Sequence, residues 1–409
     1  MFNILAQSPN HMAGLNQYSL SFLSFLIFHS LIQNSLSISF SMPPLPATDP
    51  YPPTYEPAPI ENPYFPKGIQ AAYWPSFDGF PASSIDTSYF THIYYAFLLP
   101  EPDTYRLNLT SFDQIKIPEF MDSLRTRNPP VATLLAIGGG NSNPVVFSKM
   151  VRGVSTRAVF INSTIEIARR YGFDGVDLDW EFPANDEDMT NLALLYQEWR
   201  NAIDAEAKNS GKPRLLLTSA VYFSSRFSSD EPRSYPAKAM AKYLDWVSPM
   251  CYDYHGSWEN FTGAQSALYD PKSNISTSYG IGSWIQDGVP PEKIVMGLPL
   301  YGKTWKLQDP NVNGIGAPAL GVGPGDGILL YRQIVDFNNE SKAVVVFDSQ
   351  TVSYFSIAGD SWVGFEDMFS IRWKVQYAKS SGLGGYFFWA LGQDKDWILS
   401  MHASNAWNN

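Results

Sequence analysis

The chain contains very little cysteine and histidine, and both shortages exclude classes of site. Cys251 is the single cysteine among 409 residues, so no disulfide can form within the chain. It lies in an apolar run, where a small buried side chain is expected rather than a nucleophile. The five histidines show no zinc-ligand spacing, and no glycine-rich phosphate loop is present. The sequence therefore predicts no metal, no nucleotide and no other cofactor.

Positive charge is also scarce, with 28 Lys and Arg against 39 Asp and Glu and a formal net charge of −11. Because no stretch resembles a basic stripe, nucleic acid is not expected as a partner. Hydrophobic residues make up 44% of the chain and charged residues 16%, which is typical of a globular protein with a large core. Aromatic residues reach 15%, and this excess favours a cleft that stacks the flat apolar faces of sugars.

The first part of the chain differs from the rest, because no Lys or Arg precedes Lys67. Residues 20–32 form an apolar run that is short for a membrane span and typical of a signal-peptide core. We therefore predict a leader over residues 1–42, although the usual basic start of a leader is missing. Residues 43–66 are rich in proline and predict an extended linker. The folded domain is expected over residues 67–409.

Several Asn-x-Ser/Thr sequons support passage through the secretory route, where alone they accept glycans. They lie at Asn108, Asn162, Asn260, Asn274 and Asn339. We expect an extracellular protein, with the vacuole as the alternative. Met12 is an alternative start that shortens the leader.

The most informative segment is residues 173–183, where carboxylates alternate with apolar side chains. In a β-strand, the two-residue period places Asp177, Asp179 and Glu181 on one face and the apolar side chains between them on the other. Gly175 and the large apolar neighbours indicate a strand covered by helices on its outer side, so that the acids line an interior.

Three carboxylates about 6–7 Å apart repel one another. At least one of them should therefore hold its proton more tightly than a free carboxyl group does, as a general acid requires. A solvated charged face and a carboxylate cation site are the alternatives. Neither explains the strict alternation with large apolar residues.

Beyond the linker, strand-like runs alternate with amphipathic segments such as 155–170 and 186–210. This alternation predicts a parallel sheet, and about eight such units predict a closed (β/α)₈ barrel. Residues 306–366 interrupt the pattern with runs that resemble antiparallel strands, and they are expected to form an insertion. Active sites of such barrels lie at the carboxyl ends of the strands, where Glu181 falls.

The pattern Asp174-x-x-Asp177-x-Asp179-x-Glu181 resembles the signature of glycoside hydrolase family 18, the chitinases and their relatives. From about residue 68 to 408 the chain resembles plant class V chitinases, with matching strand segments in the expected order. These segments are 69–74, 91–97, 133–139, 215–222, 246–254, 293–302 and 384–390. The resemblance implies an α/β TIM barrel with a small α+β domain, inserted between strands 7 and 8, that forms one wall of the cleft.

The resemblance also implies a substrate-assisted reaction on β-linked N-acetylglucosamine, in which the 2-acetamido oxygen of the sugar is the nucleophile. Glu181 would protonate the glycosidic oxygen and later activate water. Asp179 would orient the acetamide group and stabilise the positive intermediate, with Asp177 sharing charge and proton. Tyr252 would donate its hydroxyl to the acetamide oxygen. Asp174, of opposite strand parity, is expected to be structural.

The same resemblance implies the residues that bind the sugar. Met250 and Asp253 would line the subsite of the reacting unit, and Trp389 would form its aromatic floor. Further positions near the cleft are Tyr73, Phe97, Tyr301 and Trp362. From the residues alone, a position in the core explains each of these aromatic side chains as well as a position in the cleft does. Trp258, in the loop after the sixth strand, is expected to stack on a sugar beyond the cleavage point.

One motif departs from the family. The third strand usually reads Ser-x-Gly-Gly, and here it reads Ala136-Ile137-Gly138-Gly139. A missing hydroxyl would remove a hydrogen bond worth about 1 kcal/mol to the acids. On this ground Ala136→Ser is expected to raise the rate modestly.

Two function classes remain. The first is a secreted chitinase, with lipo-chitooligosaccharides as a variant substrate, and the second is a chitin-binding lectin or receptor-like ectodomain. Glu181, Asp179 and Tyr252 favour the enzyme, because a pure binder has no need of a proton donor. We expect a monomer whose partners are chitin or N-acetylglucosamine oligosaccharides, with no nucleic acid and no membrane after leader removal.

Overall fold

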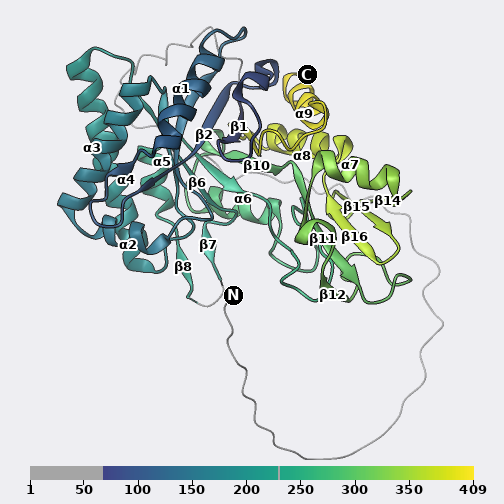
Figure 1. Cartoon of the computed structure of the whole chain (residues 1–409). Helices are drawn as coiled ribbons and strands as arrows, with labels where there is room; N and C mark the ends of the chain where they lie inside the picture. The colour runs from purple at the N-terminus through teal and green to yellow at the C-terminus, as the bar shows by residue number, and fades with distance from the viewer. Residues whose placement is uncertain (1–67, 229–230) are drawn as a thin grey trace, which may run out of the picture. The chain divides into compact units, whose positions relative to one another are not determined.

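The inner layer of the fold is a ring of parallel strands (Figure 1). The computed structural model describes residues 68–228 and 231–409, so the predicted leader and linker lie outside the described residues. The strands pair in the order β10-β17-β1-β2-β4-β5-β6-β9, and a bridge between Val247 and Ile294 joins β9 to β10. The predicted TIM barrel is therefore confirmed. Its strands are β1 (Ile69–Pro75), β2 (His92–Pro100), β4 (Ala132–Gly138), β5 (Gly175–Asp179), β6 (Leu216–Tyr222), β9 (Trp246–Met250), β10 (Val295–Pro299) and β17 (Gly385–Trp389).

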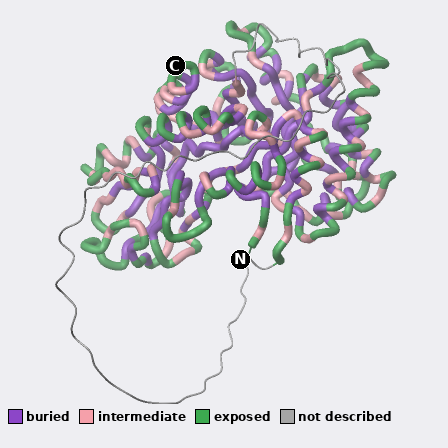
Figure 2. The backbone as a smooth tube through the Cα atoms, turned by 180° about the vertical axis from the view of Figure 1, so that it is seen from behind, coloured by how far each residue is buried: buried purple, intermediate pink, exposed green. Residues whose placement is uncertain are grey.

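Helices cover the outside of this ring, and Figure 2 shows exposed residues gathered on them and on the loops. The expected helices at 155–170 and 186–210 are confirmed as α3 and α4. Asn185 caps the start of α4 by accepting from Asp188 N, and Gly211, with φ 67°, ends it. The helices are α1 (Ser111–Arg125), α2 (Pro144–Arg152), α3 (Val154–Tyr171), α4 (Asp186–Ser210), α5 (Ala237–Tyr243), α6 (Thr277–Gln286), α8 (Met368–Ser380) and α9 (Ile398–Asn408). Short β3 (Leu107–Asn108) pairs with β2, and β7 (Arg226–Phe227) with β8 (Arg233–Ser234).

The insertion is an antiparallel sheet that lies between β10 and β17 in the chain, which are the seventh and eighth barrel strands. Its order is β12-β11-β16-β15-β14, with β13 beside β11. It begins before residue 306, because β11 already starts at Tyr301, directly after the end of β10. Its elements are β11 (Tyr301–Leu307), β12 (Ala319–Val322), β13 (Ile328–Leu330), α7 (Tyr331–Glu340), β14 (Val344–Asp348), β15 (Ser353–Ala358) and β16 (Ser361–Phe365).

Two apolar layers lie on either side of the barrel strands. Tyr94, Trp246 and Phe387 pack inside the ring. Val176 and Leu178 of β5 pack outside it, beneath the helices. The intervening acids of β5 therefore point inward, as the two-residue period predicts.

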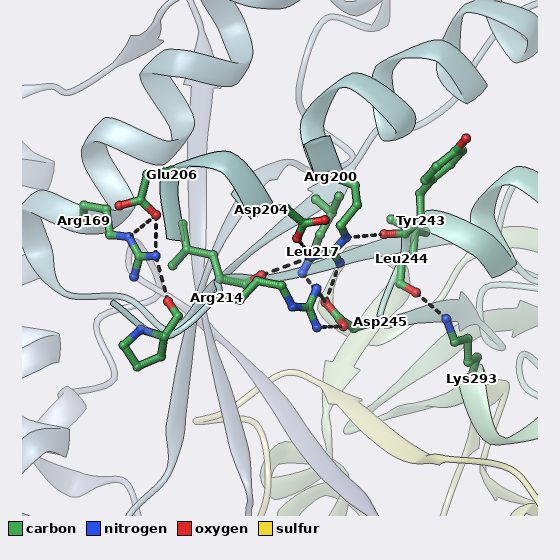
Figure 3. A network of polar contacts seen from close by, with 12 residues as sticks. Arg169, Arg200, Asp204, Glu206, Arg214, Leu217, Tyr243, Leu244, Asp245 and Lys293 are labelled. Carbon is green, nitrogen blue, oxygen red and sulfur yellow. Dashed lines mark hydrogen bonds and ion pairs between the residues drawn. The ribbon is translucent and has the colours of Figure 1, made fainter. Parts of the chain in front are cut away.

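A network of polar contacts connects helices to the barrel at the amino ends of the strands, opposite the acids of β5. Figure 3 shows Asp245 of this network near Arg200 and Arg214. Asp245, directly before β9, accepts from Arg200 Nη2 and Arg214 Nη2, both at 2.7 Å, and from Leu217 N of β6 at 2.8 Å. Arg200 of α4 also donates to the carbonyl of Tyr243 at 2.8 Å. One carboxylate thus ties α4, β6 and the start of β9 together.

Asp245→Asn is expected to lower the free energy of unfolding by about 2 kcal/mol, because the largely buried guanidinium group of Arg200 would lose its nearer counter-charge and keep only Asp204, 4.0 Å away. Denaturant unfolding followed by circular dichroism measures this change. Asp360→Asn is the control, since its pair with Lys306 is exposed and 3.7 Å long. Equal losses in the two variants would contradict the role given to Asp245.

Candidate active site

A cleft of about 670 Å³ lies at the carboxyl ends of the barrel strands. All the predicted site residues line it except Asp177, Trp258 and Trp362. Those that do are Tyr73, Phe97, Asp179, Glu181, Met250, Tyr252, Asp253, Tyr301 and Trp389. Residues far apart in the sequence are brought together because successive barrel strands all end at this face.

Asp177 lies beneath the cleft and is fully buried. Its Oδ2 accepts from the Tyr73 hydroxyl at 2.7 Å, and its Oδ1 accepts from Thr218 Oγ1 at 2.6 Å. Burial raises the pKa of Asp177 to about 6, and the two donors oppose that rise. Asp177 is therefore a carboxyl group that titrates slightly below neutral pH.

Asp179 is the last residue of β5, and Glu181 follows it by two residues. Glu181 therefore lies on the same side of the chain as Asp177 and Asp179, although it lies beyond the strand. Oδ1 of Asp179 is buried and has no hydrogen-bond partner among the described residues. Burial, then the charges of Glu181 and Asp177, raises the pKa of Asp179 well above its usual range. Burial and the charge of Asp253 raise the pKa of Glu181 to about 7, while its hydrogen bond with Asp179 opposes the rise. A proton is thus held among these acids near neutral pH.

Two side chains of the insertion hold the carboxylate of Asp253 in place. Its backbone is left-handed, with φ 58°, and its Oδ1 accepts from the Tyr301 hydroxyl at 2.7 Å. The ammonium of Lys303 lies 2.9 Å from the same oxygen, and Lys303 is nearly fully buried. Lys303 was not predicted as a site residue, although it shares strand parity with Tyr301 on β11. This β11 pair holds the acid that faces Glu181.

Aromatic rings form the floor of the cleft. Trp389, at the end of β17, stacks on Phe97 with centroids 5.6 Å apart and lies 5.7 Å from the Tyr73 ring. Tyr252 packs edge-on against Tyr301 at 6.2 Å. Burial, followed by the neighbouring acids, raises the pKa of Tyr252 well above its usual range, so its hydroxyl keeps its proton and can donate it.

Trp362 does not belong to this site, and its predicted contact with substrate is wrong. It lies opposite Trp305 in the insertion sheet, and its ring stacks on Phe355 at 5.2 Å. The indole N–H donates to the carbonyl of Asn313 at 3.0 Å. Trp362 is a fully buried core residue of the insertion.

The structure bears on two further positions. Asp174 Oδ2 accepts from Thr133 N at 2.8 Å, which confirms its structural role at the start of β5. Trp258 is exposed outside the cleft lining, with Lys303 Nζ 5.2 Å from its ring, so its contact with a sugar stays a prediction.

Other cleft residues were missed, although most follow directly after barrel strands, where such residues are expected. Gly140 lies beside the acid, where a Cβ would be 3.4 Å from both carboxylate oxygens of Glu181 and thus in van der Waals contact with them. Phe77, Leu99 and Ile275 are exposed apolar side chains that also line the cleft.

The contacts of Asp177 remove the reason for expecting a gain from Ala136→Ser. Ala136 lies beside Asp177 on β4, and Thr218 lies beside it on β6. Both oxygens of Asp177 already accept a hydrogen bond, so a hydroxyl at position 136 would be an additional donor and not the replacement of a missing one. Thr218 supplies the donor that the family motif places on the neighbouring strand.

Thr218→Val is expected to lower kcat about tenfold with little change in KM, because a hydrogen bond to a charged group contributes about 1.5–3 kcal/mol. The loss also raises the pKa of Asp177, so the acidic limb of the pH profile should move to higher pH. Ala136→Ser, close to neutral alone, should recover part of the rate in the double variant. A double variant no faster than Thr218→Val would refute this compensation.

Two kinds of feature are absent from the part of the chain that the structure describes. No group of three or more His, Cys, Asp or Glu side chains there is arranged to hold a metal ion. Nor is any helix within those residues both long and apolar enough to cross a membrane.

Comparisons with known proteins agree with this geometry. The family model described as "Glycosyl hydrolases family 18" matches residues 70–394. The chain is 56% identical over 346 residues to Class V chitinase CHIT5a of Medicago truncatula, covering 84% of this chain and 90% of that protein. It is similar to a class V chitinase mutant of Nicotiana tobaccum in complex with NAG4 (TM-score 0.81, 39% identity, 84% and 99% coverage). It is also similar to a chitinase-like agglutinin of Robinia pseudoacacia (TM-score 0.78, 42% identity, 83% and 99% coverage).

Proposed function

The chain belongs to family 18 of the glycosyl hydrolases, and from that membership we propose that it cleaves β-1,4 linkages between N-acetylglucosamine units with retention of configuration. It is a chitinase, a hydrolase of glycosidic bonds. The observation that carries the proposed mechanism is the arrangement of Asp179 and Glu181 in the cleft with Asp177 buried beneath them, where burial raises the pKa of all three acids. The substrate is chitin or a chitooligosaccharide.

In the first step, protonated Glu181 gives its proton to the glycosidic oxygen as the bond from that oxygen to C1 breaks. The carbonyl oxygen of the 2-acetamido group forms a bond to the same C1, so the nucleophile belongs to the substrate. Tyr252 donates to that oxygen and positions it. Asp179, whose Oδ1 is buried and without a partner, accepts the acetamide N–H and stabilises the positive charge.

In the second step, ionised Glu181 takes a proton from water while the water oxygen attacks C1 from the face the leaving group has vacated. The bond from C1 to the acetamide oxygen breaks, and the sugar keeps its original configuration. Asp179 can ionise during this cycle because Asp177, with a pKa of about 6, is able to take up a proton.

Observations also support one alternative function and one variant substrate. The likeness to an agglutinin keeps a lectin as the alternative, but a lectin has no use for a proton donor such as Glu181. Lipo-chitooligosaccharides are a variant substrate, because exposed apolar side chains in the cleft lining would contact an acyl chain. These side chains are Phe77, Leu99 and Ile275.

We also propose that the protein is secreted or vacuolar and acts as a monomer. The asparagine of each sequon is exposed, which supports attachment of glycans in the secretory route. These residues are Asn108, Asn162, Asn260, Asn274 and Asn339.

The test is incubation of the protein with chitohexaose, with the anomers of the first products resolved by chromatography, beside a Glu181→Gln control. Early β-anomeric products from the native protein alone are expected. An early excess of α-anomers would refute the retaining mechanism. Tight binding by both proteins without cleavage would identify a lectin instead.

A further inference from the structure

Helix α8 carries two apolar faces, and one of them points away from the barrel. Its inner face holds the barrel wall through Ile371, Val375 and Ala378, which are buried. Phe369, Trp373 and Tyr377 follow one another at four-residue spacing and so lie on a common face. Trp373 is 52% exposed and Phe369 41%. A helix that packs by one face normally presents polar residues on the other, so packing on the barrel does not account for the exposed ring of Trp373.

The aromatic face of α8 lines a groove of about 470 Å³ that shares no lining residue with the catalytic cleft. Tyr269, 45% exposed, also lines it, and its ring meets that of Tyr377 edge-on at 6.1 Å. Phe347 of β14 meets Phe369 edge-on at 5.1 Å. No lining residue is charged, and the polar ones are Ser349, Gln376 and Ser380.

Hydrogen bonds of the backbone and of two side chains hold the wall of the groove between β14 and β15 in place. The N–H of Leu268 donates to the carbonyl of Thr351 at 2.8 Å, which ties the loop before α6 to this turn. Thr351 donates from N and Oγ1 to Asp348 Oδ2, at 2.9 and 2.6 Å. Val352, which lines the groove, is left-handed at φ 54°, a costly conformation for a β-branched residue. The groove is therefore preformed, which lowers the entropy lost on binding.

We propose that this groove is a second binding site for β-linked N-acetylglucosamine chains, and this inference rests on the proposed function. Pyranose rings present flat C–H faces that pack on aromatic rings, and Trp373 and Tyr269 offer exposed rings. The polymer is neutral and so is the lining, so that binding buries no unpaired charge. Gln376 and the two serines can hydrogen-bond to hydroxyl and acetamide groups.

The groove is also joined to the catalytic cleft by a single loop. Tyr269 lines the groove, and Ile275, at the other end of residues 269–275, lines the cleft. These seven residues span at most about 25 Å, so one polymer chain is long enough to reach both sites. The groove is expected to matter for long or insoluble chains and not for short soluble ones.

The test measures binding of the full chain to insoluble chitin, with Glu181→Gln in every protein to prevent cleavage. Adding Trp373→Ala is expected to weaken this binding about fivefold, and Trp373→Tyr should retain most of it. Phe112→Ala, at an exposed aromatic residue on α1, is the matched control and should bind normally. In the active protein, Trp373→Ala should leave hydrolysis of chitotetraose unchanged.

Unchanged binding of the Trp373→Ala variant to insoluble chitin would overturn the proposal. So would a native dimer that Trp373→Ala converts to monomer in analytical ultracentrifugation, because a second copy of the chain would then occupy the groove. These outcomes are separate from failure of the proposed function, which would appear as no hydrolysis of chitohexaose by the native protein.

Discussion

Glu181→Gln is expected to lower the turnover of chitohexaose about a thousandfold, because general acid–base catalysis contributes about 10²–10⁴-fold. Glutamine has the shape of the protonated acid but cannot release a proton to the glycosidic oxygen. Binding should change little, since Glu181 is itself protonated below its pKa of about 7. Initial rates by chromatography and affinities by calorimetry measure the two effects.

Glu187→Gln is the matched control for that experiment. Glu187 is an exposed acid in the first turn of α4, close in sequence to Glu181 but outside the cleft lining. It should turn over chitohexaose at the native rate. A Glu181→Gln protein with more than a tenth of the native rate would show that another group supplies the proton.

The second large effect is on the pH dependence of kcat/KM. Burial, and then the charge of Asp253, raises the pKa of Glu181 to about 7. The acid must be protonated to act, so the rate is expected to fall above pH 7, about tenfold per pH unit and about a hundredfold by pH 9. Initial rates on chitohexaose from pH 5 to 9 measure this limb.

Asp253→Asn should move the alkaline limb to lower pH, because it removes a negative charge that raises the pKa of Glu181. Asparagine tolerates the left-handed backbone at this position, so the loop is expected to keep its path. Asp309→Asn, at an exposed site in the insertion, should leave the limb in place. An unshifted limb in Asp253→Asn would mean that burial alone sets this pKa.

Strand parity explains how much of the site the sequence revealed. Because β5 alternates with period two, the inward direction of Asp177 and Asp179 followed from their spacing alone. The period of α4 and its capping residues likewise located that helix. The family motif then placed Glu181 at the carboxyl end of the strand.

Strand parity does not predict which residue of the adjacent strand will lie beside a given side chain. Thr218 reaches Asp177 because of the register between β5 and β6, which no local pattern encodes. Lys303 reaches Asp253 because β11 continues directly from β10, which lies beside β9 in the ring. Trp362 and Trp389 both lie in aromatic strands, and nothing local separates the one in the core of the insertion from the one on the cleft floor.

The stacked pair of Phe97 and Trp389 joins the second barrel strand to the last one, and this arrangement affects when the chain becomes active during synthesis. A nascent chain that ends before β17 carries all three acids and Tyr252, but it lacks Trp389 of the cleft floor. Hydrolytic activity should therefore arise only once the chain is nearly complete. A nascent chain would thus not hydrolyse N-acetylglucosamine polymers until β17 pairs with β1 and β10 and closes the ring.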